Sequence, residues 1–120
     1  MITEEGLKLR AVYWEGDSLK VLRTFPDAIR GNLGHDLFLL QQGKMPLSSR
    51  PMVTIGPSVF ELKDSDERAW YRLIYYTQVK ERIYVLHVFG KKSRKTSKTD
   101  LRTAGLRLKK VQERLRQGRV

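Results

Sequence analysis

The pattern of hydrophobic and polar positions predicts short strands and amphipathic helices along the chain. A first strand is predicted where every second side chain is apolar, at Leu7, Leu9, Ala11 and Tyr13. After a break at residues 16–18, apolar side chains recur at helical spacing up to Pro26, at Leu19, Leu22 and Phe25. A second helix, ending near Gly43, is predicted by a stripe at Ile29, Leu33, Leu37 and Leu40.

The middle of the chain predicts a loop followed by three strands. Residues 44–57 are rich in Pro, Ser, Gly and Met, a composition that is typical of a loop, with room for one short extended piece around Val53. Residues 59–63 and 69–77 alternate as strands do, and residues 83–89 are almost wholly apolar. Short turns separate the three segments, so we expect successive strands to pair antiparallel.

The C-terminal segment predicts a helix with one apolar seam. The seam positions are Leu101, Ala104, Leu108, Val111 and Leu115. It covers only about two heptads, which is too short for an independent coiled coil. We therefore expect this helix to dock on the domain's own sheet or on a partner.

These elements predict a single α+β domain over residues 1–120, in the order β-α-α-β-β-β-α. The two early helices are expected to cover one face of an antiparallel sheet and to leave the other face partly open for function. A basic tail and the last helix occupy residues 91–120.

Charge adds one strong feature, because the excess of positive charge lies in the last quarter of the chain. The formal net charge is +11. Residues 1–90 carry 12 Lys and Arg against 11 Asp and Glu, whereas residues 91–120 carry 12 against 2. A polyanionic partner is the usual physical reason for such a block, and a basic tail that only aids solubility is the alternative.

Several classes of chemistry lack their residues in this sequence. There is no Cys, and His35 and His87 stand 52 residues apart, so no metal-ligand cluster is recognisable. His35 lies off the helical stripe and is expected at the surface. The glycines form neither a phosphate loop nor a dinucleotide fingerprint. No apolar run approaches about 18 residues, and the acidic N-terminal segment does not fit a signal peptide. We therefore expect a cytoplasmic protein without metal or cofactor.

Residues 69–98 concentrate the chemistry that remains. Alternation places Arg72 on one face together with Trp70, Ile74 and Tyr76. A guanidinium in such surroundings must meet a buried anion or line a cleft that receives one. The following strand runs through Gly90 into a lysine-rich tail. Cations can bind a scissile phosphate, and RNA supplies its own 2′-hydroxyl as nucleophile, so a small cationic domain suffices for RNA cleavage.

Two motifs follow one another in this segment, Tyr71-Arg72-Leu73-Ile74-Tyr75 and Leu86-His87-Val88-Phe89-Gly90-Lys91-Lys92. Together they resemble the RelE superfamily of toxins, most closely its phage-derived, HigB-like branch. The specific motifs cover about residues 59–98. The resemblance implies a microbial-RNase-like α+β fold and an mRNA endoribonuclease, commonly acting in the ribosomal A site, that is the toxin of a type II toxin–antitoxin pair.

The resemblance also implies roles for single residues. The superfamily's essential strand arginine falls on Arg72, which would hold and stabilise the scissile phosphate. The basic residue after the following strand falls on Lys92, with Lys91 beside it. Of two lysines on the preceding strand, one matches Lys63 and the other is replaced by Glu61. A tyrosine near the C-terminal end has no counterpart around residues 98–99, so that role is unfilled.

We therefore expect the catalytic residues to be Arg72, Lys92, Lys91, His87 and Glu61. Glu61 or His87 would accept the 2′-hydroxyl proton, and a lysine would serve the leaving 5′ oxygen. The residues expected to bind RNA are Lys63, Arg94, Lys95, Lys98 and Tyr75.

Structural alternatives exist for these residues and for the function. Arg72 could form a structural pair with Glu61, His87 could be a hydrogen-bonded core residue, and Tyr75 could be a core ring. The function could instead be that of the gyrase-binding ParE branch, which cuts no RNA, or that of a plain nucleic-acid-binding module.

The expected partners are mRNA, the ribosome and a cognate antitoxin with a helix-turn-helix domain. An acidic or amphipathic segment of that antitoxin would cover the basic face or pack near the last helix. No membrane partner is expected.

Overall fold

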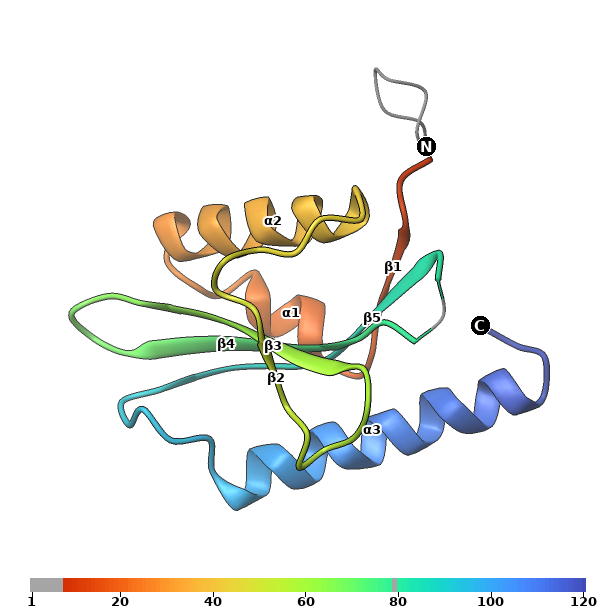
Figure 1. The fold of residues 1–120 in the computed structure, drawn as a ribbon. Coiled ribbons are helices and arrows are strands. Elements are labelled where there is room, and N and C mark those ends of the chain that lie inside the picture. The colour runs from red at the N-terminus through yellow and green to blue at the C-terminus, as the bar shows by residue number, and fades with distance from the viewer. Residues whose placement is uncertain (1–7, 79) are drawn as a thin grey trace.

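The computed structural model describes residues 8–78 and 80–120 and shows one five-stranded sheet with helices on both of its faces (Figure 1). The elements in chain order are β1 (Ala11–Trp14), α1 (Ser18–Leu22), α2 (Asp27–Gln41), β2 (Arg50–Pro51), β3 (Val59–Ser65), β4 (Trp70–Tyr76), β5 (Arg82–Lys91) and α3 (Lys98–Arg116). The α+β class and the predicted order are confirmed, with the two-residue strand β2 added. Leu7, expected in the first strand, lies outside the described residues.

The strands lie in the order β1-β5-β4-β3-β2. The successive strands β2, β3, β4 and β5 pair antiparallel with one another, as expected for short strands joined by turns. β1 differs, because it pairs parallel with β5, Val12 facing Ile83. A long connection carries the chain from β1 to β5, and such a connection allows parallel pairing where a tight turn does not.

The helices α1 and α2 cover one face of the sheet (Figure 1). The predicted α2 stripe is buried there, at Ile29, Leu33, Leu37 and Leu40. It packs on side chains such as Leu62 and Leu73, which point to that face from β3 and β4. Gly43 follows α2 with a φ of +81°, a conformation that glycine adopts without steric cost, so the predicted stop is confirmed.

The helix α3 covers the opposite face, which the sequence had suggested would be partly open. Ala104, Leu108 and Val111 are buried against a cluster that includes Ile74 and Tyr84. The seam therefore docks on the protein's own sheet, one of the two arrangements expected for it. In the described ranges, no helix is both long and apolar enough to cross a membrane.

The ends of several elements meet at one side of the molecule. Trp70 at the start of β4 faces Lys91 at the end of β5, and the chain then turns through residues 92–97 into α3 (left in Figure 1). The predicted cationic residues lie at this end of the sheet, where β5 leads into the turn before α3.

Candidate nucleic-acid interface

Arg72 and Glu61 form a buried ion pair on neighbouring strands. Nη1 of Arg72 donates hydrogen bonds to Oε1 and Oε2 of Glu61, each at 2.9 Å. The two residues are 6% and 7% exposed. The pair foreseen as a structural alternative is therefore present. Glu61 engages only one of the three guanidinium nitrogens.

The Nε atom of Arg72 is also buried, and it has no hydrogen-bond partner within residues 8–78 and 80–120. A buried N–H group left without an acceptor costs about 1–3 kcal/mol. Such a group calls for an explanation, and one explanation is a ligand. The guanidinium matches phosphate oxygens in shape and charge, but Nε is closed off from solvent, so an anion reaches it only when the side chains that cover it move.

Further cations surround this position. Lys63 on β3 lies directly opposite Arg72 in the register of the two strands. Its Nζ atom is 5.6 Å from the centre of the Trp70 ring, and Cζ of Arg94 lies 5.0 Å from the same centre. Arg72, Lys63, Trp70 and Arg94 thus form one cluster at the end of the sheet.

His87 reaches the α3 side of the sheet through a β-bulge. Ile74 pairs with His87 and Tyr75 with Val85, so Leu86 has no partner on β4. A bulge of this kind re-aims the side chains beyond it. Without the bulge, strict alternation would place His87 on the same face as Val85, beneath α1 and α2.

Both ring nitrogens of His87 are engaged within the fold. Nε2 lies 2.8 Å from Oδ1 of Asp100, and Nδ1 lies 3.3 Å from Nη1 of Arg107. Because arginine only donates, Nδ1 accepts this bond and Nε2 carries the hydrogen that Asp100 accepts. His87 is thus a hydrogen-bonded residue between the sheet and α3, as its structural alternative described.

Asp100 connects several of these groups, although the sequence analysis did not single it out. Its Oδ2 atom accepts from Lys91 Nζ at 2.8 Å and from Ser97 Oγ at 2.7 Å. Burial alone would raise the pKa of Asp100, but the hydrogen bonds from Lys91, His87 and Ser97 outweigh it and hold that pKa below its usual value. The Ser97-x-x-Asp100 spacing of a helix N-terminus was the available sequence signal.

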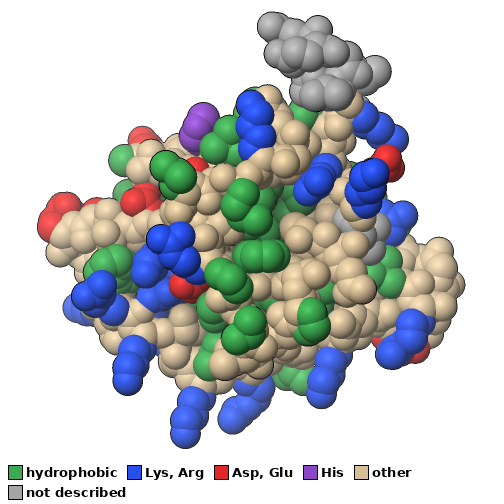
Figure 2. Space-filling view, viewed as in Figure 1, with side chains coloured by type: hydrophobic (Ala, Val, Ile, Leu, Met, Phe, Trp, Pro, Cys, Tyr) green, Lys and Arg blue, Asp and Glu red, His purple; other side chains and the backbone are tan. Residues whose placement is uncertain are grey.

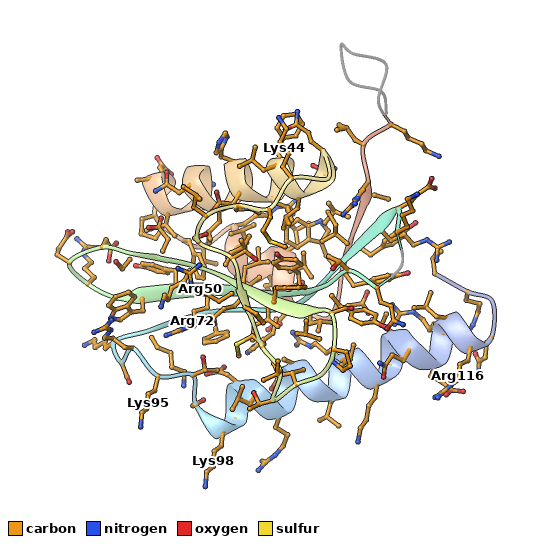
Figure 3. The ribbon with its side chains drawn as sticks, viewed as in Figure 1. Lys44, Arg50, Arg72, Lys95, Lys98 and Arg116 are labelled. Atoms are coloured by element: carbon orange, nitrogen blue, oxygen red, sulfur yellow. The ribbon has the colours of Figure 1, made fainter. Side chains whose placement is uncertain are left out.

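The remaining basic residues point into solvent. Lys92, Arg94, Lys95 and Lys98 are exposed, and Figure 3 shows Lys95 and Lys98 extending away from the sheet. Figure 2 shows Lys and Arg side chains gathered over this end of the sheet and in a row along α3. The predicted residues Glu61, Lys63, Arg72, Lys91 and Arg94 come together, while Lys92, Lys95 and Lys98 border them in sequence.

Tyr75 is the exception, and the prediction that it stacks on RNA is corrected. Its side chain is fully buried on the face covered by α1 and α2, opposite to the face that carries Arg72. Its hydroxyl lies 2.5 Å from Ser49 Oγ, its ring stacks on Phe60, and burial raises its pKa. The ring is therefore not accessible to a base.

Known proteins share part of the sequence pattern and the fold of this chain. Residues 20–109 match the model of a family described as phage-derived Gp49-like proteins (DUF891). No curated protein matches the chain. Three solved structures of Escherichia coli proteins are similar to it, two of the toxin RelE alone and one of the toxin with its antitoxin.

The first is a free RelE toxin with two arginines mutated to alanine, with a TM-score of 0.59 and 16% identity, covering 83% of this chain and 97% of that one. The second is the isolated RelE toxin, with a TM-score of 0.53 and 19% identity over 88% and 98% of the two chains. The third is the intact RelBE toxin–antitoxin complex, with a TM-score of 0.51 and 20% identity over 72% and 99%. At these identities the three structures establish the fold.

Proposed function

The chain belongs to the phage-derived Gp49-like family, and on that premise we propose that it is the toxin of a type II toxin–antitoxin pair. Its action would be metal-free cleavage of mRNA on the ribosome in the cytoplasm, which arrests translation. The observation that carries the proposal is the buried Arg72 guanidinium, which Glu61 holds on one nitrogen. Lys63 lies opposite Arg72 in the strand register, and Lys63 and Arg94 both lie at the ring of Trp70, on the same strand as Arg72. The RelE-like fold supports the same proposal, that the protein is a toxin.

Arg72 would bind the scissile phosphate. Glu61 occupies Nη1, and Nε has no partner in the described part of the chain but is closed off from solvent, so a phosphate oxygen would bind the guanidinium after the side chains that cover it move. Lys63 lies directly opposite and would add a second positive charge. Lys91 and Lys92, at the end of β5, would complete the positive surroundings. These charges stabilise the negative charge that develops on the phosphate in the transition state.

In the proposed reaction the 2′ oxygen forms a bond to phosphorus, and the bond from phosphorus to the 5′ oxygen breaks. The products are a 2′,3′-cyclic phosphate and a 5′-hydroxyl. Glu61 would accept the 2′-hydroxyl proton, because a phosphate on Arg72 places the nucleophile beside its carboxylate. Lys63 would give a proton to the leaving oxygen. We assign the base to Glu61 rather than His87, because the single acceptor nitrogen of His87 already accepts from Arg107, whereas each Glu61 oxygen keeps a second lone pair beside its bond to Arg72.

The exposed basic residues Lys92, Arg94, Lys95 and Lys98 would bind the backbone of mRNA or ribosomal RNA. Contacts of this kind carry no sequence information, and they weaken steeply as salt is added. They would hold the message in register with Arg72.

The second proposed partner is a cognate antitoxin. The net charge of +11 favours an acidic segment in that partner, and the basic end of the sheet or the outside of α3 is where such a segment would bind. We propose that the antitoxin carries a helix-turn-helix domain, as the resemblance to the HigB-like branch implies.

The direct test compares cleavage of message on translating ribosomes in EDTA. Wild type should cut the message and leave 2′,3′-cyclic phosphate ends, while Arg72→Ala and Arg72→Lys should not. Arg23→Ala, an exposed arginine near α1, is the matched control and should cut like wild type. Thermal unfolding must show that each variant is folded. Equal cleavage by wild type and a folded Arg72 variant would contradict the assignment.

The same assay separates the alternatives. A wild-type protein that leaves message intact but inhibits DNA gyrase would have the ParE-like activity. A protein that binds nucleic acid in a salt-sensitive way, with neither effect, would be a plain binding module.

A further inference from the structure

Trp70 is a half-buried aromatic side chain beside the Arg72 position, and the site described so far gives it no role. It is the first residue of β4 and lies opposite Ser65 on β3 and Lys91 on β5. Phe89, which lies opposite Arg72 in the register of β4 and β5, is buried. Trp70 is thus a partly exposed aromatic ring at the end of the sheet where the cations lie.

The cations around Trp70 distinguish it from an ordinary surface tryptophan. Lys63 Nζ lies 5.6 Å from the ring centre and Arg94 Cζ lies 5.0 Å from it. Both charges fall within the range in which a cation is attracted to an aromatic face. Arg94 is exposed in the segment between β5 and α3, so it can leave the ring without disturbing the core.

The spacing along β4 connects the ring with the proposed phosphate position. Trp70 and Arg72 are two residues apart on one strand and therefore point to the same face, about 7 Å apart along it. That separation is comparable to the reach from a backbone phosphate to an adjacent base. A nucleotide strand that places a phosphate on Arg72 would therefore bring one base to Trp70.

We propose that Trp70 is a stacking platform for one nucleobase of single-stranded RNA, next to the phosphate held by Arg72. Arg94 covers the ring in the free protein and moves to the RNA backbone when the base stacks. The inference rests on the proposed function, since it names how the same site holds its substrate. Base stacking on an aromatic side chain tolerates any sequence, so Trp70 would contribute affinity and position without selecting a base.

The test measures binding separately from cleavage. The protein has two tryptophans, so Trp14→Phe leaves Trp70 as the fluorescent reporter. The probes are a short 2′-O-methyl RNA, which cannot be cleaved because its nucleophile is blocked, and an oligomer of equal length and charge with one abasic position. Both are titrated at low salt, where backbone contacts keep binding measurable.

The RNA with all its bases should quench Trp70 fluorescence. A series of oligomers with the abasic position moved along the strand should contain one that quenches much less. Variants of Trp70 lose this reporter, so their affinities are measured by fluorescence anisotropy of an end-labelled RNA. Trp70→Leu should weaken binding of the full RNA by about fivefold to 150-fold, the range for loss of one stacked base. Trp70→Phe, which keeps a ring, should retain most of the affinity. Trp14→Phe alone is the control and should bind like wild type.

Two results would overturn the inference. One is equal quenching by every oligomer in the abasic series, and the other is unchanged affinity in a folded Trp70→Leu variant. Cleavage of unmodified message on ribosomes is measured in parallel. Base-dependent quenching without cleavage would count against the nuclease and leave the platform standing, whereas cleavage without base-dependent quenching would count against the platform alone.

Discussion

The Nη1 atom of Arg72 lies 2.9 Å from each carboxylate oxygen of Glu61, and both residues are more than nine-tenths buried. Here Nε is buried without a partner among the residues that the structure describes. The pair therefore holds Arg72 in place and leaves its Nε atom, which is covered from solvent, without an acceptor.

The first prediction concerns the stability of this pair. Arg72→Met should lower the free energy of unfolding by about 3–5 kcal/mol, because Glu61 is left as a buried charge without its partner. Adding Glu61→Leu should restore much of that loss, since an apolar pair of similar volume avoids the buried charge. Urea unfolding at neutral pH measures Arg72→Met, Glu61→Leu and the double variant. A double variant as unstable as the sum of the two single variants would contradict this account.

The second prediction concerns acid stability. The pKa of Asp100 is lower in the folded protein than its usual value of 3.8, so this residue stabilises the fold above that pH, and its contribution is lost as the pH falls toward the folded pKa. Asp100→Asn should therefore be less stable than wild type near neutral pH, and the difference should shrink as the solution is acidified. Thermal unfolding between about pH 7 and pH 2 measures this difference.

A constant difference between wild type and Asp100→Asn across that range would show that the carboxylate charge plays no part. Glu67→Gln, in the exposed turn between β3 and β4, provides a control for the loss of one surface carboxylate.

The third prediction tests the docking of α3 on the sheet. Leu108 is 5% exposed and packs on the sheet, whereas Leu106 on the same helix is 55% exposed. Leu108→Ala should cost about 2–5 kcal/mol, because it removes buried side-chain volume and leaves a cavity. Leu106→Ala should change the stability by less than about 0.5 kcal/mol. Similar losses in the two variants would mean that the helix is not held by this seam.

The fourth prediction concerns the basic tail. Lys95→Ala and Lys98→Ala should each weaken RNA binding to a similar extent for different sequences and reduce the slope of log affinity against log salt by about 1. The reason is that each lysine displaces counterions from the backbone. Lys20→Ala, an exposed cation of α1 on the other side of the sheet, is the control. An unchanged salt slope in both tail variants would place the RNA elsewhere.

The sequence alone determined the elements and the faces on which their side chains lie. Period-two alternation placed Arg72 with Trp70 and Ile74, and the structure confirms that face. The stripes of α2 and α3 were readable in the same way, and the motifs around Arg72 and His87 indicated the family that the comparison confirms. All of these are local properties, because the side-chain direction along a helix or strand follows from its period.

Only the tertiary structure decided which groups meet. The sequence left open whether Arg72 pairs with Glu61. The Ser97-x-x-Asp100 spacing marks a helix start, but it does not indicate that Asp100, 13 residues beyond His87, joins His87 and Lys91. Packing likewise decided the bulge at Leu86 and the parallel pairing of β1 with β5. It also decided the burial of Tyr75, whose hydroxyl contacts Ser49. Each depends on contacts between segments that are distant in the chain, and local periodicity carries no information about such contacts.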